Sequence, residues 1–225
     1  MDRDIKISKG KKHIELCDIC YKINKGFKLN EIIDEDELQY YKLVRDYNNY
    51  CLIRDKDNKV ELCFKSSANA RDLSTSLNNN LVRYDEYGWY NHKENLVKGC
   101  MVHRGYKRFW LGMRQHLLNY IEVSKNIYIT GHSMGGAIAI LAAYDLSLNG
   151  LNVKEVVTFG APKIGNNKFV ENYNILLTNK TIQFQIVFDP ITIFPVRRYT
   201  HVDKKFKMGG LGHSFRKYYN YFQKN

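Results

Sequence analysis

The stretch IYITGHSMGGAIAIL, residues 127–141, joins two kinds of sequence at a single serine. A short run rich in β-branched residues precedes the serine and a run of small apolar residues follows it, which predicts a strand, a sharp turn and a helix. Gly131 and Gly135 stand two places to either side and complete the pattern G-x-S-x-G. In this context the pattern marks a nucleophile elbow, because the glycines leave room for a strained, outward-facing Ser133. The alternative is an ordinary turn built from common turn residues.

The elements on either side of this stretch indicate the class of fold. Upstream, a set of apolar residues recurs at helical spacing and predicts a helix after residue 104: Tyr106, Phe109, Trp110, Met113, Leu117 and Tyr120. NIYIT, EVVTFG and IQFQIVF read as strands, and GGAIAILAAYDLSL and NNKFVENYNILL read as helices between them. Strands that alternate with helices imply an α/β fold with a mostly parallel central sheet flanked by helices.

The first hundred residues are organised differently. Residues 1–45 are charged and favour helix, whereas YCLIRD and KVELCFK read as two strands of a hairpin around KDN. Residues 68–100 are polar, rich in asparagine and weakly periodic, which is typical of a functional excursion such as a lid. Because no linker, repeat or low-complexity segment interrupts the chain, we expect residues 1–225 to form a single domain.

The charge of the chain indicates what it can attract. The sequence has 35 Lys and Arg against 23 Asp and Glu, a formal charge of +12, and its hydrophobic fraction of 44% is that of a globular protein. Such a field attracts polyanions, either nucleic acid or an anionic lipid surface. No arginine-rich stripe or aromatic-interleaved RNA motif is present, so binding of nucleic acid is not favoured.

The cysteines and the first twenty residues indicate the cellular compartment of the protein. Cys17 and Cys20 form a CxxC pair that would suit half a zinc site or a redox pair, but no second pair or spaced histidines complete it. We therefore expect reduced structural cysteines and no metal or other cofactor. The first twenty residues contain no apolar signal region and no stretch is long enough to span a bilayer. Together these features predict a reducing, intracellular (cytoplasmic) setting.

A nucleophilic serine needs a base and an acid to orient that base. In folds with this elbow the order along the chain is serine, acid, histidine. Asp189 follows the strand IQFQIVF directly, where a parallel sheet builds its sites, although an Asp-Pro turn is the plain alternative. His213 follows a glycine-rich segment and is favoured as the base over His201. His132 and His103 are expected to be structural, the first packed beside the elbow and the second hydrogen-bonded.

Six stretches of the chain resemble the class 3 lipase family, the fungal triacylglycerol-lipase-like branch of the α/β-hydrolases. They cover roughly residues 50–220 and occur in the family's order: CLIRDKDNKVELCFKSSANARDLSTSL, MVHRGYKRFW, ITGHSMGGAIAILAAYDL, VVTFGAPKIGNNKFV, QIVFDPITIFP and GHSFRKYY. The chain departs from the family's usual Arg-Gly before the oxyanion residue, where it carries Lys65-Ser66.

The resemblance implies a fold, a reaction and site residues. It implies an α/β-hydrolase with Ser133 as nucleophile, Asp189 as acid and His213 as base. It also implies that Ser67 and the backbone of Met134 donate to the oxyanion, and that the substrate is a lipid ester, as for a triacylglycerol lipase or a phospholipase. The positive charge and the mostly polar lid counterpart favour a phospholipid or lysolipid at an anionic membrane surface over neutral oil.

Other readings of the function stay open at the level of sequence. A soluble carboxylesterase for short acyl esters would use the same residues. A catalytically weak or inactive lipase-like interaction module would share the fold without the activity, because fold and function separate readily. The natural lipid, the acyl length, the regiospecificity and the oligomeric state have no signal in the sequence.

Overall fold

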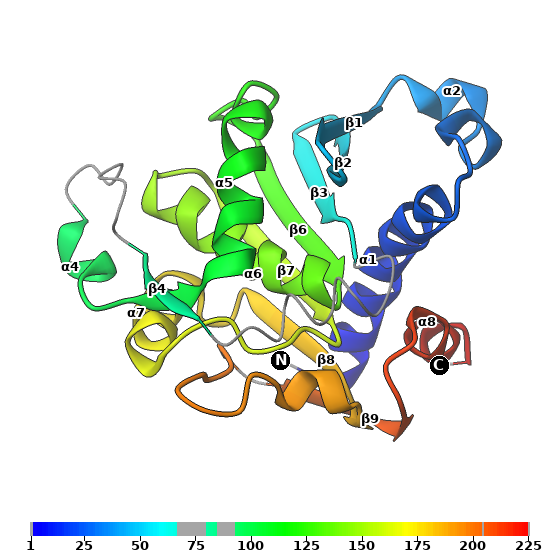
Figure 1. Ribbon diagram of the computed structural model, residues 1–225. Helices are drawn as coiled ribbons and strands as arrows, with labels where there is room; N and C mark the ends of the chain where they lie inside the picture. The colour runs from blue at the N-terminus through cyan, green and yellow to red at the C-terminus, as the bar shows by residue number, and fades with distance from the viewer. Residues whose placement is uncertain (1, 67–79, 85–92, 204, 225) are drawn as a thin grey trace.

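A seven-stranded sheet forms the centre of the computed structural model, which describes residues 2–66, 80–84, 93–203 and 205–224 (Figure 1). The order of strands across the sheet is β1-β2-β3-β6-β7-β8-β9, and β4 and β5 form a separate pair. The strands are β1 (Tyr41–Asp46), β2 (Asn49–Lys56), β3 (Lys59–Phe64), β4 (Leu81–Arg83), β5 (Met101–His103), β6 (Asn126–His132), β7 (Val153–Phe159), β8 (Thr181–Phe188) and β9 (Lys205–Leu211). From β3 to β9 every neighbouring pair in the sheet is parallel, whereas β1, β2 and β3 are antiparallel. The expected mostly parallel sheet is confirmed.

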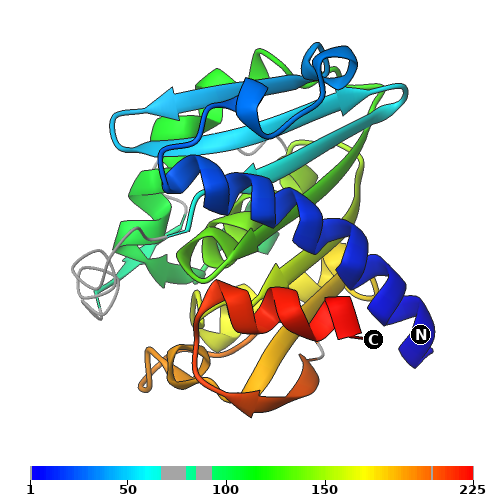
Figure 2. The ribbon, with the colours of Figure 1, turned by 90° about the vertical axis from the view of Figure 1, so that its right-hand side faces the viewer.

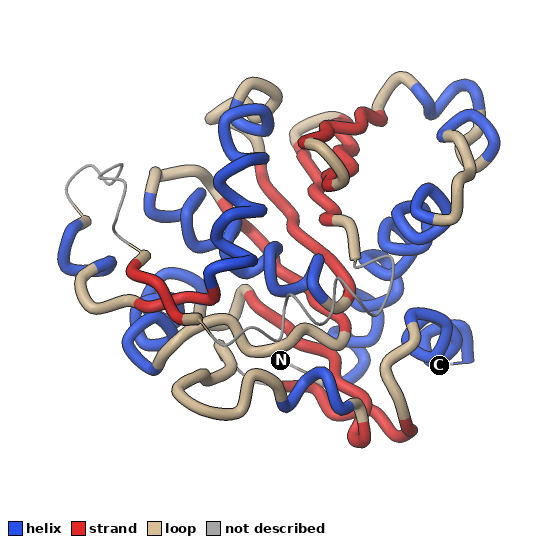
Figure 3. Tube along the Cα trace, in the orientation of Figure 1, coloured by secondary structure: helices blue, strands red, loops and turns tan. Residues whose placement is uncertain are grey.

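Helices cover both faces of the sheet (Figure 1 and Figure 3). The helices are α1 (Arg3–Asn24), α2 (Glu35–Leu38), α4 (Glu94–Val97), α5 (Arg104–Leu118), α6 (Met134–Leu148), α7 (Asn167–Leu177) and α8 (Phe215–Lys224), with 3-10 turns η1 (Leu29–Glu31) and η2 (Pro190–Ile193). Figure 2 shows α1 running across one face with α8 beside it, and α5, α6 and α7 lie on the other face. The first and last described helices are therefore neighbours.

Each face of the sheet carries its own apolar core, because successive side chains of a strand point to opposite faces. In β3, Leu62 contributes to the core beneath α5, α6 and α7, and the next residue, Cys63, contributes to the core beneath α1 and α8. Helix α6 is almost entirely apolar and is buried between the sheet and its neighbouring helices, and its one charged residue, Asp145, pairs with Arg114. This buried helix begins directly after Ser133 and so holds the elbow in a fixed frame.

The structure confirms the predicted hairpin and corrects three other expectations. Strands β2 and β3 pair around a turn in which Asp57 has a φ of 55°. Residues 1–45 are helical only in part, because the segment from Tyr41 onward forms β1 and extends the hairpin to three strands. Tyr120 is not on the buried face of the predicted helix, since α5 ends at Leu118 and the Tyr120 side chain is 43% exposed.

The third correction concerns the glycine-rich stretch GGLG at 209–212, which the sequence predicts to be a loop before His213: its first three residues belong to the parallel edge strand β9. The excursion at 68–100 is described only in part. Its described residues contain β4 and α4, while 67–79 and 85–92, and with them the lid counterpart ARDLSTSLN at 70–78, lie outside the described residues.

Candidate active site

Ser133 lies at the junction of β6 and α6 in a backbone conformation that few residues adopt. Its φ is 56° and its ψ is −125°, and its side chain is 2% exposed. A Cβ atom at Gly131 would lie 2.3 Å from the backbone of Gly135, and one at Gly135 would lie 2.2 Å from the carbonyl oxygen of Phe64. Both glycines are therefore required by close backbone approach, as the pattern predicted.

Ser133, His213 and Asp189 form a continuous hydrogen-bonded relay. Ser133 Oγ lies 2.7 Å from His213 Nε2, and His213 Nδ1 lies 2.7 Å from Asp189 Oδ2 and 2.9 Å from Asp189 Oδ1. Because Nδ1–H donates to the carboxylate, Nε2 is left to accept the serine proton. The three residues follow β6, β8 and β9, so the sheet brings them to one edge although 80 residues separate the serine from the histidine along the chain.

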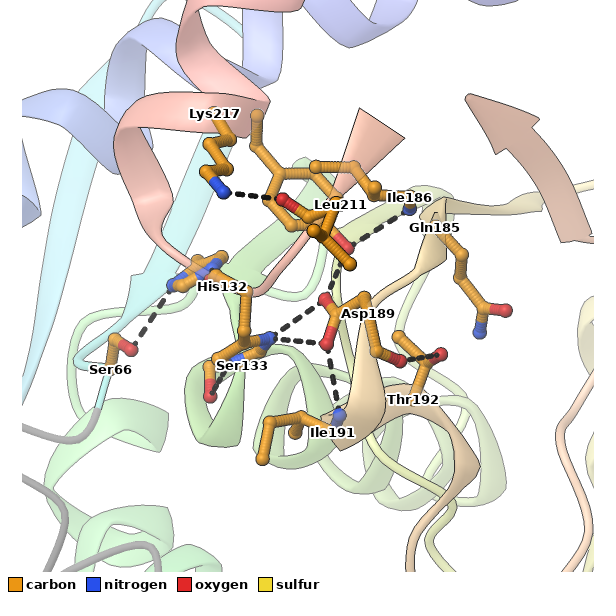
Figure 4. Close-up of polar contacts among 12 residues, drawn as sticks. Ser66, His132, Ser133, Gln185, Ile186, Asp189, Ile191, Thr192, Leu211 and Lys217 are labelled. Carbon is orange, nitrogen blue, oxygen red and sulfur yellow. Dashed lines mark hydrogen bonds and ion pairs between the residues drawn. The ribbon is translucent and has the colours of Figure 1, made fainter. Parts of the chain in front are cut away.

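The carboxylate of Asp189 is buried and held by further donors (Figure 4). Tyr218 Oη donates to Oδ2 at 2.6 Å, and the backbone N–H of Ile191 donates to Oδ1 at 2.9 Å. Burial and the neighbouring Asp189 charge raise the pKa of Tyr218, which keeps its hydroxyl protonated. These donors hold the carboxylate in one orientation toward His213.

Sequence reasoning missed Tyr218. The sequence does contain a signal for this residue, because the spacing of Phe215, Tyr218 and Phe222 predicts the buried face of a helix. Tyr218 is the residue of that face that has a hydroxyl group. A buried tyrosine hydroxyl needs a hydrogen-bond partner, and the nearest predicted acid was Asp189.

His132 packs beside the relay, as expected, and contacts the base directly. Its ring stacks on the ring of His213 with centroids 4.9 Å apart, and its Nε2 lies 3.1 Å from the carbonyl oxygen of His213. Its Nδ1 lies 3.3 Å from Ser66 Oγ (Figure 4). Burial, and secondarily the proximity of His213, lowers the pKa of His132 well below its usual value. His132 is therefore neutral. It supports the ring of His213 by stacking on it and adds no positive charge beside the base.

The other two histidines lie away from the relay. His201 Nε2 contacts the carbonyl oxygen of Thr192 at 2.6 Å, and burial lowers the pKa of His201 to about 4. His103 caps helix α5, since its Nδ1 accepts from the backbone N–H of Gly105 at 3.1 Å. Of these two histidines and His213, the structure brings only His213 within hydrogen-bond distance of Ser133.

Of the expected oxyanion donors, Met134 occupies the first position of α6, next to the nucleophile. Amides in the first turn of a helix point outward along the axis and carry partial positive charge. Ser67 lies outside the described residues, while the two residues before it, Lys65 and Ser66, continue from the end of β3 toward the elbow.

A pocket of about 270 Å³ opens beside the relay. Its floor includes Ser133, His132 and His213, and its walls come from α1, the end of β3 and the start of α8. Cys17 and Cys20 contribute buried thiols to the wall, and all five cysteines are unbridged. Within the described ranges no group of three or more His, Cys, Asp or Glu side chains is arranged to hold a metal ion.

The parallel sheet, the elbow and the order serine, acid, histidine are those of the α/β-hydrolase fold. It belongs to the class 3 lipase family, because the family model described as "Lipase (class 3)" matches residues 62–199.

Individual relatives agree with this assignment. The chain is 28% identical over 126 residues to the secreted mono- and diacylglycerol lipase 1 of Fusarium solani, a match that covers 52% of this chain and 37% of that protein. It is 33% identical over 94 residues to phospholipase A1-IIdelta of Arabidopsis thaliana, covering 40% of this chain and 23% of that protein. The matches thus span well under half the length of these curated relatives.

Solved structures share the fold at low sequence identity. The triacylglyceride lipase of Rhizomucor miehei superposes with a TM-score of 0.72 at 18% identity, over 93% of this chain and 82% of that one. The Lip2 lipase of Yarrowia lipolytica has a TM-score of 0.72 at 20% identity, over 91% and 80%. These likenesses establish the fold across nearly the whole chain.

Proposed function

We propose that the protein is a serine hydrolase that cleaves carboxylic esters of lipids through a covalent acyl-enzyme. The observation that carries this proposal is the relay of Ser133, His213 and Asp189, with 2.7 Å between Oγ and Nε2 and 2.7 Å between Nδ1 and Oδ2. Hydrogen bonds of this length join a nucleophile to its base and the base to its orienting acid.

The reaction follows from the positions of the donors and acceptors. His213 Nε2 takes the proton from Ser133 Oγ, which attacks the ester carbonyl. His213 then returns this proton to the leaving alcohol, and water repeats the sequence to release the acid. Asp189 keeps the imidazole in the required tautomer and stabilises its charged form, while Tyr218 holds the carboxylate in place.

The oxyanion of the tetrahedral intermediate needs donors on the other side of the serine. We assign this role to the backbone amide of Met134 at the start of α6 and to Ser67, following the family pattern. Loss of one such donor costs on the order of 100–1,000-fold in rate in related sites.

A lipid surface is the partner that best fits the rim of the site. The segments next to Asp189 and His213 expose large apolar side chains, and the protein carries a formal charge of +12. These side chains are Val187, Phe188, Ile193, Val196 and Leu211. Exposed apolar groups within a cationic protein favour an anionic bilayer. Sedimentation with liposomes should show binding that prefers anionic lipid and weakens with salt. Salt-insensitive binding would contradict this preference.

The first experiment on function is labelling with a fluorophosphonate probe. We expect rapid labelling of the wild-type protein and none of Ser133→Ala, because the probe reacts only with an activated serine. Absence of labelling in folded protein, with detergent present, would contradict the hydrolase and leave an interaction module. A series of esters of increasing acyl length then separates a lipase from a short-chain carboxylesterase.

Two further features remain proposals. We infer a reducing compartment from five unbridged cysteines, although the fungal relatives are named as secreted. None of the helices in the described part of the chain combines the length and hydropathy needed to cross a bilayer.

We also infer that residues 1–225 form one domain, because one sheet runs from β1 to β9. Coincident urea transitions by fluorescence and circular dichroism would support one cooperative unit, and two separate transitions would contradict it.

A further inference from the structure

Two cationic side chains flank the pocket beside the nucleophile, where the first and last described helices meet. Lys25 follows the end of α1, and Arg216 lies in the first turn of α8. Lys25 Nζ lies 5.6 Å and the Arg216 guanidinium carbon lies 5.4 Å from the ring centre of the same residue, Tyr21. The Tyr21 ring in turn stacks on Phe215 with centroids 4.9 Å apart. The stacked rings of Tyr21 and Phe215 thus hold both cations beside the pocket through contacts with the Tyr21 ring.

Some cations of α1 are paired with carboxylates. Lys9 and Lys22 of α1 pair with the carboxylates of Glu155 and Asp18. In the described part of the chain, by contrast, no carboxylate pairs with Lys25 or Arg216. A bound anion would therefore be able to pair with both side chains.

The position of Arg216 makes an anion more favourable still. The first turn of a helix has a partial positive charge, so a cation there is opposed by the helix dipole. Helix α8 has ten residues and no acidic residue in its first turn. The dipole of α1 favours the positive charge of Lys25 at the C-terminal end of that helix, whereas the dipole of α8 disfavours the positive charge of Arg216. An anion at this place would complement the amides and both side chains.

The chemistry of the relay decides which part of the substrate reaches the pocket. The general acid must contact the oxygen of the leaving alcohol, so the alcohol lies on the His213 side of the scissile carbonyl. The pocket is lined by His213 and the three residues that follow it, up to Arg216. Its volume of about 270 Å³ admits a compact group; most of its lining is apolar, and Lys25 and Arg216 supply its cationic side chains. Sites for drug-sized ligands measure roughly 300–1,000 Å³.

We propose that Lys25 and Arg216 bind a phosphate carried by the leaving alcohol, so that the preferred substrates are acyl esters of glycerol phosphate, such as phospholipids and lysophospholipids. This inference rests on the proposed hydrolase function and names its substrate class. The cations act on the substrate molecule itself, in addition to any attraction of the protein to an anionic surface.

The test compares two soluble esters that differ only in the phosphate, 1-butyrylglycerol 3-phosphate and 1-butyrylglycerol. Both are monomeric, so surface attraction does not contribute. We expect the K25Q/R216Q variant to lose about tenfold or more in kcat/KM on the phosphate ester, mainly through KM. Each exposed ion contact is worth up to about five-fold. The loss on the neutral ester should be much smaller, so that the ratio of the two kcat/KM values falls about tenfold, and R216K should keep most of the preference.

The chain offers a matched control at the other end of the sheet. Lys12 Nζ and Lys59 Nζ lie 5.7 and 5.9 Å from the ring centre of Tyr128, near the start of β6 and away from the pocket. The K12Q/K59Q variant removes the same net charge from the same kind of contact. It should hydrolyse both esters like the wild-type protein, and an equal loss in both double variants would overturn the proposal.

Binding to Ser133→Ala separates this inference from the proposed function. Calorimetry should show that this variant binds the phosphate ester at least about tenfold more tightly than the neutral ester, and that adding K25Q/R216Q removes the difference. If binding behaves so but the wild-type protein hydrolyses neither ester, the hydrolase proposal fails and the phosphate site stands. If both esters are hydrolysed equally and only inorganic phosphate binds, the site holds free phosphate and the assigned substrate class is wrong.

Discussion

Replacing Gly135 by alanine tests whether the approach of β3 to α6 sets the geometry of the nucleophile. The new Cβ would lie 2.2 Å from the carbonyl oxygen of Phe64 and 2.9 Å from that of Lys65. Carbon–oxygen contacts of this kind are tolerated from about 3.3 Å, so the start of α6 and the end of β3 must separate by roughly 1 Å. A displacement of that size at a reacting group costs about 100-fold in rate.

We therefore expect Gly135→Ala to lower kcat/KM for p-nitrophenyl butyrate by about 100-fold. The strain of overpacking, about 1–3 kcal/mol, is partly offset by a gain of about 1 kcal/mol in helix propensity, so the loss of unfolding free energy should be small. Gly209→Ala is the matched control, because a Cβ there meets no atom within 4 Å. A Gly135→Ala enzyme that keeps its activity within threefold and gains stability would refute the reasoning.

The remaining predictions concern the hydrogen bonds that support Asp189 and the protonation of His201. Tyr218→Phe removes a donor from Asp189 and an acceptor from the N–H of Ile186, so we expect the unfolding free energy in urea to fall by about 2–4 kcal/mol; an unchanged urea midpoint would contradict this. His201 has a pKa of about 4 in the folded protein, below its usual value near 6.5, so its contribution to stability is complete above pH 6.5 and is lost as the pH falls toward 4. The loss reaches up to about 3 kcal/mol, and His201→Gln should flatten the decline of unfolding free energy measured between pH 7 and 4.5; equal slopes for variant and wild-type protein would count against it.

Sequence reasoning succeeded where the signal is local. The elbow at Ser133 is encoded by residues within two positions of it, and the hairpin of β2 and β3 by the polar turn between them. The predicted positions of Asp189 and His213 depend only on the order of elements along the chain, and the sheet does bring both to the serine.

What the sequence did not reveal depends on distant partners. Strand β9 contains Gly209 and Gly210 and reads locally as a loop, but β8 supplies the hydrogen bonds that make it a strand. Tyr120 continues the apolar spacing of α5, yet the helix ends at Leu118, so the spacing alone did not mark the boundary. The contact of Tyr218 with Asp189 and the pocket between α1 and α8 join residues from different parts of the chain, for which a single sequence carries no pairing information.

The contact between Tyr21 and Phe215 joins α1 and α8, which are synthesised at different times. A ribosome delivers α1 and the elbow long before it delivers His213 and α8. Until then the serine has no base, and the apolar face that α8 covers stays open to chaperones or to a bilayer. Closing a loop of nearly two hundred residues is slow compared with forming local helices. Hydrolytic competence therefore requires that His213 has been synthesised and that α8 has packed on this face.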